Sequence, residues 1–202
     1  MKALLRAAIM VAVMGGAAQG ALAADKAADK AAADKAAADK ARPPGASELR
    51  ASAEKGNAAA QNNLAVNYAT GNGVPKDMAE AARWYAKAAE QGYAIAQHSL
   101  GGMYENGNGV SKDLSTAGVW YSLAAEQGDP WAQLSLAELN TNPAFAKGDP
   151  AVAYRWLLVA SRSADKEAKA AAEAAAKKLG PKLSQAARTT AELAAKAWRP
   201  NQ

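Results

Sequence analysis

The chain has 202 residues, with 24 basic and 19 acidic side chains, a formal net charge of +5 at pH 7 and no cysteine. The absence of cysteine excludes disulfides and a cysteine-linked lipid anchor. The net charge is mild and spread along the chain, which argues against nucleic acid as a partner. The length is enough for one domain with its own core plus a tail.

Residues 1–23 have the pattern of a secretory signal peptide. Two basic residues precede an apolar run from Ala7 to Met14, and the tripeptide Ala21-Leu22-Ala23 offers a cleavage site after Ala23. A membrane-spanning helix is the alternative interpretation, but it needs about 20 apolar residues, and glycines interrupt this run early. We therefore expect a periplasmic or secreted protein with no membrane span once the signal peptide is removed.

Residues 24–45 consist almost wholly of alanine, aspartate and lysine before an Arg-Pro-Pro-Gly break. Alanine favours helix, but Asp25 and Asp29 would place like charges four residues apart, which is mildly unfavourable. The segment has no large apolar side chain to bury, so we expect a solvated tether. A coiled coil or a partner-binding helix is the alternative, although the segment has no apolar seam for either.

A period of thirty-six residues runs through the rest of the chain. Several residue types recur at that spacing: Gly56, Gly92 and Gly128; Leu64, Leu100 and Leu136; Asp77, Asp113 and Asp149; Trp84, Trp120 and Trp156. A fixed period in this range is typical of a solenoid, in which each repeat buries its apolar face by stacking on its neighbours. The predicted repeats are 56–91, 92–127 and a degenerate third copy over 128–164.

Each of the two regular copies is predicted to form two helices joined by a tight turn. Glycine permits the positive φ that such a reversal needs, and the glycines of these turns are Gly71, Gly73, Gly107 and Gly109. Asp77 and Asp113 stand where the second helix begins, so we expect their carboxylates to cap its first turn. Glu80 is predicted to complete a capping box with Asp77.

The third copy departs from this pattern between its two helices. Asn140 stands in place of the tyrosine of the other copies, and residues 142–145, Asn-Pro-Ala-Phe, replace the glycine turn. Asp149 followed by Pro150 still predicts the start of a helix. The pattern does not specify the conformation of the loop between them.

The residues of the first copy resemble a known repeat. The string runs Leu64-Ala65-x-x-Tyr68-x-x-Gly71-x-Gly73-Val74-x-x-Asp77 and continues Ala81-x-x-Trp84-Tyr85-x-x-Ala88-Ala89-x-x-Gly92. This pattern is similar to the Sel-one-like repeat, a relative of the tetratricopeptide repeat, and it recurs in register in the second copy. The resemblance implies an all-α fold, a right-handed α-α solenoid of helix-turn-helix repeats. Helices over 46–55 and 165–202 are predicted to cap its ends.

No residue pattern indicates catalysis, a cofactor or a metal site. His98 is the only histidine, and a single imidazole without clustered ligands makes no zinc site. Its counterparts Asn62 and Leu134 differ from it, so we expect a surface position. The tryptophans that recur with the period are predicted to be core wedges, whereas Trp131 and Trp198 break it and are the better candidates for contact with a ligand.

The resemblance also implies that the first helices line a concave surface that binds other proteins or peptides. The positions that vary between copies on these helices are the candidates for contact: Asn62, Asn63, Val66, Asn67, His98, Ser99, Gly102, Met103, Leu134, Ser135, Glu138 and Leu139. Each quartet occupies one side of its helix. Met103, Leu134 and Leu139 are the candidate apolar anchors. The alternative is that all twelve are ordinary solvated positions.

The sequence therefore favours an exported scaffold, adaptor or regulator that binds a protein or peptide partner and has no catalytic role. A peptidoglycan or glycan-binding module is the first alternative, with an exposed Trp131 as its distinguishing feature. A cell-wall or β-lactam hydrolase is a further alternative, suggested by cysteine-rich relatives. The missing cysteines and the absence of a clustered nucleophile and base argue against it.

Overall fold

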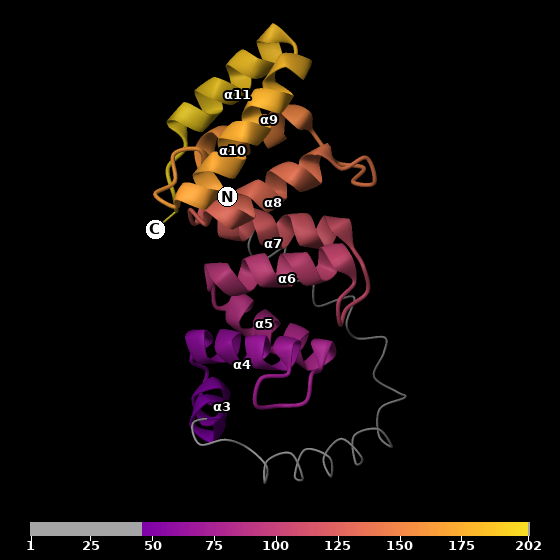
Figure 1. The fold of residues 1–202 in the computed structure, drawn as a ribbon, viewed down its shortest axis with the longest axis vertical. Coiled ribbons are helices and arrows are strands. Elements are labelled where there is room, and N and C mark those ends of the chain that lie inside the picture. The colour runs from indigo at the N-terminus through magenta and orange to yellow at the C-terminus, as the bar shows by residue number, and fades with distance from the viewer. Residues whose placement is uncertain (1–45, 202) are drawn as a thin grey trace.

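The computed structural model describes residues 46–201, and this part of the chain contains helices and loops only. The α-helices, stacked in Figure 1, are α3 (Ala46–Glu54), α4 (Ala58–Thr70), α5 (Met78–Glu90), α6 (Ala94–Asn106), α7 (Leu114–Glu126), α8 (Pro130–Thr141), α9 (Pro150–Ala160), α10 (Lys166–Leu179) and α11 (Gln185–Ala197). A short 3-10 helix, η2 (Gly180–Lys182), joins the last two. The predicted signal peptide, 1–23, and tether, 24–45, lie outside the described residues. Within 46–201 no helix is long and apolar enough to cross a membrane.

The helices form the α-α solenoid that the repeat pattern predicts. The three repeats are the pairs α4 and α5, α6 and α7, and α8 and α9, and the second helix of each pair packs on the first helix of the next. Helix α3 packs on α4 at one end of the stack, and α10 and α11 pack on α9 at the other. The ends of the stack therefore carry helices within the predicted capping ranges.

Glycines in the left-handed region close the inner turns of the first two repeats. Gly71 and Gly107 have φ of +80° and +74°, and Gly73 and Gly109 have φ of +69° and +72°. At Gly109 a side chain is also excluded by space, because a Cβ there would overlap the carbonyl of Met78 in the preceding repeat. The turn glycines thus reverse the chain and, in the second repeat, let the turn touch its neighbour.

Asp77 and Asp113 begin the second helices, as the sequence predicts. The Asp77 carboxylate accepts the N–H of Glu80 at 3.0 Å, and Asp113 makes the corresponding contact in the next repeat. The predicted capping box is wrong in its other half, because the Asp77 amide donates to the Tyr68 carbonyl at 2.9 Å. The Glu80 side chain pairs with Arg83 instead.

Asn140 holds the irregular loop of the third repeat. In the regular copies the carbonyl of the tyrosine accepts the amide of the capping aspartate. Here the side-chain oxygen of Asn140 accepts the Asp149 amide at 3.2 Å, and its Nδ2 donates to the Leu136 carbonyl at 2.8 Å. Phe145 packs partly buried against the core. The third helix pair therefore keeps its geometry with a side chain in place of a backbone carbonyl.

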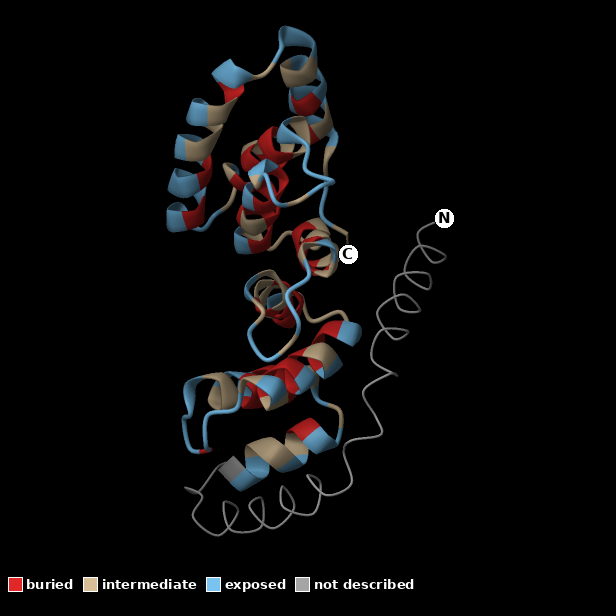
Figure 2. Cartoon of the chain, turned by 90° about the vertical axis from the view of Figure 1, so that its right-hand side faces the viewer, coloured by how far each residue is buried: buried red, intermediate tan, exposed pale blue. Residues whose placement is uncertain are grey.

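The three periodic tryptophans are buried. Trp84, Trp120 and Trp156 are 6%, 5% and 2% exposed. Trp120, on α7, packs in the same apolar cluster as Trp84, one repeat earlier, so it joins successive repeats. Fully buried alanines such as Ala88 allow the helices to approach closely around these rings. Figure 2 shows the buried positions lying on the inward sides of the helices along the whole stack.

One buried glutamine in each repeat binds the helix before it. The Nε2 atoms of Gln61, Gln97 and Gln133 donate to the carbonyls of Ala53, Ala89 and Ala125 at 3.0, 3.0 and 3.1 Å. These carbonyls lie in the last turns of α3, α5 and α7, and each also accepts the amide of the glycine three residues on: Gly56, Gly92 or Gly128. We call these contacts the glutamine rungs. The side-chain oxygens of Gln61 and Gln97 in turn accept Nε2 of Gln91 and Gln127, each at 2.7 Å.

The last residues fold back on the third repeat and on the end of the second. The Trp198 ring stands edge-on to Trp156 with centroids 6.0 Å apart, and its Nε1 donates to the Glu126 carboxylate at 3.3 Å. The Asn201 amide donates to the Glu126 carbonyl at 2.7 Å. Trp198 is therefore a packing residue, which corrects the prediction that it is a candidate for ligand contact.

Replacing Trp120 by alanine should lower the free energy of unfolding by about 3–5 kcal/mol, because the ring is buried at a junction between repeats. Chemical denaturation followed by circular dichroism measures this change. Trp131→Ala is the matched control, since that ring is 39% exposed, and its loss should stay below about 1 kcal/mol. Equal losses for the two variants would contradict the assignment of Trp120 as a core wedge.

Replacing Gln97 by leucine should lower the free energy of unfolding by about 0.5–1.5 kcal/mol, because the hydrogen bonds of Gln97 to the Ala89 carbonyl and to Gln127 are lost while the carbonyl keeps the Gly92 amide. The same denaturation experiment measures it. Gln185→Leu removes an exposed glutamine at the start of α11 and serves as the control, with almost no expected change. A Gln97→Leu variant as stable as the parent would show that the rung is dispensable.

Candidate partner-binding surface

The outer sides of α4, α6 and α8 lie together along one side of the stack (Figure 1). We call this surface the first-helix face, and its residues are Ala59, Asn63, Val66, Ile95, Ser99, Gly102, Trp131, Ser135 and Glu138. All nine are exposed or half-buried. Six of them are the middle positions of the predicted contact quartets, so the centre of each quartet is accessible to a partner.

The edge positions of the quartets are largely covered by neighbouring helices. Met103, Leu134 and Leu139 are 5%, 7% and 0% exposed, so the prediction that they are apolar anchors for a partner is wrong. Asn62 is also buried, and Asn67 is half-buried. Successive residues are about 100° apart around a helix, so the outer members of a quartet turn towards the adjoining repeats while the inner members face outward.

Three large apolar side chains are exposed on the first-helix face. Val66, Ile95 and Trp131 are 40%, 52% and 39% exposed. Ile95 and Trp131 stand thirty-six residues apart, in a column that begins with Ala59. Trp131 thus does not recur as a tryptophan, as predicted, but its position in the repeat is that of Ile95 and Ala59. The sequence-based prediction did not include Ile95. The thirty-six-residue spacing of Ala59, Ile95 and Trp131, whose apolar side chains increase in size, could have identified it.

Two adjacent asparagines, Asn62 and Asn63, lie at the α4 end of the face, the first buried and the second exposed. The Oδ1 atom of Asn62 is buried and accepts no hydrogen bond within residues 46–201. Its Nδ2 reaches the Oδ1 of Asn63, at 3.4 Å. A buried acceptor without a donor is costly, and a carboxamide can both accept and donate. Asn62 therefore belongs to the interior, and Asn63 is the exposed carboxamide at this end of the face.

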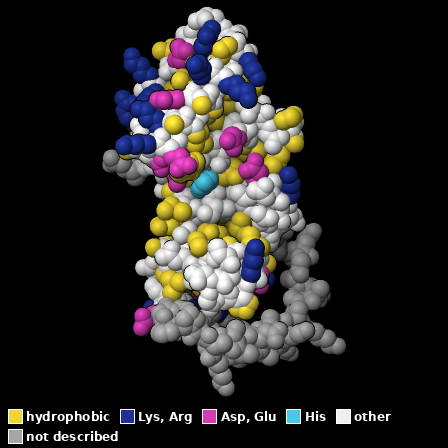
Figure 3. All heavy atoms as spheres, in the orientation of Figure 1, with side chains coloured by type: hydrophobic (Ala, Val, Ile, Leu, Met, Phe, Trp, Pro, Cys, Tyr) yellow, Lys and Arg dark blue, Asp and Glu magenta, His cyan; other side chains and the backbone are white. Residues whose placement is uncertain are grey.

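His98 links α6 to α8. Its Nε2 is 3.1 Å from Ser135 Oγ, and its ring lies 5.6 Å from the Tyr121 ring at an angle of 45°. Burial lowers the pKa of His98 below its ordinary 6.5, while the carboxylates of Asp129 and Glu105 oppose that shift. The predicted surface position is corrected accordingly: the ring is half-buried between repeats, and part of it reaches the surface beside acidic side chains (Figure 3).

Tyr121, on α7, forms the floor beneath this part of the face. Its hydroxyl donates to the Glu105 carboxylate at 2.7 Å. Burial, together with that carboxylate, raises the pKa of Tyr121 far above its ordinary 10.0, so the hydroxyl stays protonated. A Cβ at Gly101 would lie 2.6 Å from the ring, so glycine allows α6 to approach α7 here. The tyrosine thus supports the face from below.

The recurring residues serve the fold rather than the face. Those in helix junctions, turns and caps are Trp84, Trp120, Trp156, Gly71, Gly73, Gly107, Gly109, Asp77 and Asp113. Among residues 46–201 no group of three or more His, Cys, Asp or Glu side chains is placed to hold a metal ion. The geometry of the face is that of a contact surface, with apolar side chains set among amides and hydroxyls.

The family model of the Sel1 repeat matches residues 58–93, 94–129 and 132–165, which together make up more than half of the chain. The chain therefore belongs to the Sel1 repeat family. Sel1 repeats generally mediate protein–protein interaction, and their fold is typically a non-enzymatic scaffold. No curated protein matches the chain.

Solved structures similar to this chain include the following two. A protective antigen present in uropathogenic Escherichia coli strains, which displays an SLR fold, is 32% identical with a TM-score of 0.67 over 75% of this chain and 32% of the antigen. A Sel1 repeat protein from Oxalobacter formigenes is 34% identical with a TM-score of 0.55 over 62% of this chain and 95% of that protein. This chain thus spans about a third of the antigen's length.

Lowering the pH from about 7.5 to about 5 should destabilise the fold in part through His98. Because its folded pKa lies below the unfolded value near 6.5, the unfolded state takes up the proton first. This contribution is present above the unfolded pKa and is lost as the pH falls through the folded pKa. Urea denaturation at several pH values measures the loss, which should be smaller in His98→Asn. An NMR titration of His98 with a midpoint at or above 6.5 would contradict this account.

Proposed function

We propose that this chain is an exported scaffold, adaptor or regulator that binds a protein or peptide partner on its first-helix face. The observation that carries the proposal is the exposure of Val66, Ile95 and Trp131 on this face in three successive repeats. Apolar anchors surrounded by polar groups are typical of protein interfaces. The family's general role in protein–protein interaction supports the same conclusion.

The polar groups of the face favour a polypeptide as the partner. The exposed carboxamide of Asn63 can both accept and donate hydrogen bonds to a main chain. Ser99 donates its hydroxyl to the Ile95 carbonyl, at 2.9 Å, and its side chain also interacts with the Tyr85 hydroxyl beneath the face. Exposed apolar side chains and polar groups thus lie together on the face, which suits a polypeptide segment lying across several repeats.

Export is the second part of the proposal and rests on the signal-peptide pattern of residues 1–23. The partner then belongs to the periplasm or to the outside of the cell. A fold without cysteine does not depend on the redox state of either compartment. The tether predicted over residues 24–45 would give the folded part reach.

A peptidoglycan or glycan-binding module is the second candidate, and one observation favours it. The Trp131 ring is 39% exposed at the end of the face, with its Nε1 3.3 Å from the Asp165 carboxylate. An indole held in this way offers apolar surface on which a sugar ring can stack. The same ring serves equally as a peptide anchor, so an experiment has to separate the two.

Photo-crosslinking in the exporting cell tests the proposal. A photoreactive residue at Ser99 should capture a protein partner, and the adduct should disappear when Ile95→Asp is added, because a charge on the face removes an apolar anchor. The same photoreactive residue at Arg83, exposed on α5, is the matched control and should capture nothing in common with Ser99. Circular dichroism checks that Ile95→Asp still folds.

Other outcomes assign the chain differently. Saturable binding to purified peptidoglycan that is lost in Trp131→Ala, with no protein adduct at Ser99, would favour the glycan-binding candidate. Turnover of a cell-wall or β-lactam substrate, abolished by one substitution, would place the chain among enzymes. Either result would overturn the scaffold proposal.

A further inference from the structure

A pocket of about 280 Å³ opens between α8, α9 and α10, at the end of the first-helix face. Its floor is apolar and includes Leu157 on α9 and Leu179 on α10. Glu138 belongs both to the wall of this pocket and to the first-helix face, so the two are continuous. A partner lying along the face reaches the pocket after the third repeat.

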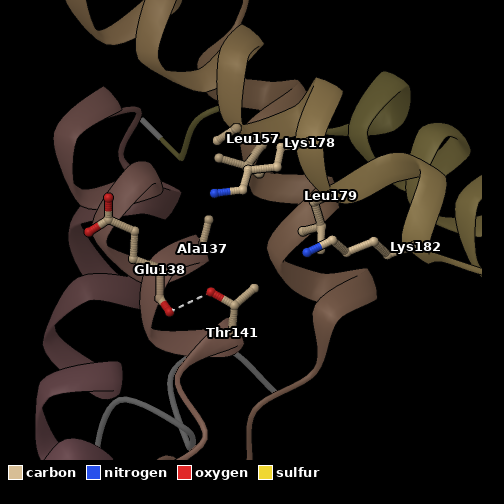
Figure 4. A pocket seen from close by; sticks show the side chains of 8 residues that line it. Ala137, Glu138, Thr141, Leu157, Lys178, Leu179 and Lys182 are labelled. Carbon is tan, nitrogen blue, oxygen red and sulfur yellow. Dashed lines mark hydrogen bonds between the residues drawn. The ribbon is translucent and has the colours of Figure 1, made fainter.

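Two lysines line the side of the pocket opposite α8. Figure 4 shows Lys178 on α10 and Lys182 in η2 extending towards the α8 wall, where Glu138 and Thr141 lie. Neither ammonium group forms an ion pair or hydrogen bond within residues 46–201. Lys169, on the same helix, differs in this respect, because its Nζ lies 3.9 Å from the Glu173 carboxylate. Both pocket lysines are therefore available to an anionic ligand.

The surface around the pocket is positively charged, like the two lysines. Residues 165–202 contain eight basic and four acidic side chains, a net charge of +4, whereas residues 56–164 contain seven basic and nine acidic side chains, a net charge of −2. In Figure 3 the Lys and Arg side chains gather over the C-terminal helices. A field of this kind attracts acidic segments to the capping helices and repels basic ones.

We propose that this pocket binds an acidic peptide segment of a protein partner, with one aliphatic side chain on the apolar floor and flanking carboxylates on Lys178 and Lys182. The inference rests on the proposed function, and it identifies the chemistry of the segment that leaves the first-helix face at this end. Glu138, on the opposite wall, repels carboxylates and accepts main-chain N–H groups. The ligand's acidic side chains therefore point to α10 and its backbone passes over α8.

The size of the pocket limits what its floor can hold. Pockets for small molecules usually measure about 300–1,000 Å³, so a volume of about 280 Å³ is enough for an amino-acid side chain with part of its neighbours but small for a long acyl chain. A bare inorganic anion would leave the leucine floor unused. The combination of an apolar floor with unpaired lysines at its rim thus favours a peptide over a lipid or a phosphate ion.

Fluorescence anisotropy with a blocked, labelled peptide, Asp-Glu-Leu-Glu-Asp, tests this assignment on the mature chain. The peptide should bind at least about tenfold more tightly than Asn-Gln-Leu-Gln-Asn, which lacks the charges, and than Asp-Glu-Gly-Glu-Asp, which lacks the aliphatic side chain. The double variant Lys178→Gln/Lys182→Gln should lose at least about tenfold in affinity. The control Lys166→Gln/Lys196→Gln removes the same charge from exposed sites outside the pocket and should lose less than about threefold.

Each of the following results would overturn the assignment of the pocket to an acidic peptide. Equal losses in the two double variants would mean that the basic surface attracts acids without the pocket, and equal binding of the glycine peptide would mean that the floor is unused. Binding to phosphatidylglycerol vesicles but not to the peptide would make the basic surface a membrane contact. A chain that captures a protein at Ser99 yet does not bind the peptide would keep the proposed function and overturn the pocket assignment alone.

Discussion

The contact between a buried glutamine amide and the last turn of the preceding helix sets the geometry of the whole stack. A solenoid has few contacts between distant residues, so the rotation from one repeat to the next depends on what fixes each junction. Gln61, Gln97 and Gln133 fix it with a directed bond to a carbonyl in the last turn of the preceding helix, which also accepts the amide of the glycine that ends that helix. Apolar packing alone would tolerate small rotations. A directed hydrogen bond restricts such rotations, so it keeps the first helices in register.

Register in turn decides which side chains a partner meets. Because α4, α6 and α8 present the same helical position to the outside, Ala59, Ile95 and Trp131 form one column. The chemistry changes along it, from amides at α4, through the half-buried His98 region, to an indole and a carboxylate at α8. Charge changes with it, since the repeats are slightly acidic and the capping helices are basic. A partner that matches this order binds in one direction only.

Much of this architecture could be predicted from the sequence, because its causes are local. The period marks the repeats, glycines permit the turns, and the caps at Asp77 and Asp113 need only neighbouring amides. Burial of Met103 and Leu139 could not be predicted, since it depends on how far the next repeat rotates over each helix. The pocket at Lys178 and Lys182 could not be predicted either, because α10 contacts α8 only after the chain has folded back.

The return of the C-terminal residues to Glu126 changes the order in which the stack can open. Repeats of a solenoid contact only their neighbours, so separation ordinarily starts at whichever end is least attached. Trp198 and Asn201 bind the end of α7, across the whole third repeat, so the C-terminal helices separate only if a contact to the second repeat also breaks. Helix α3 packs on α4 at the other end of the stack. Opening of the C-terminal end requires two junctions to break together, so we expect the pocket-bearing helices to stay assembled with α7.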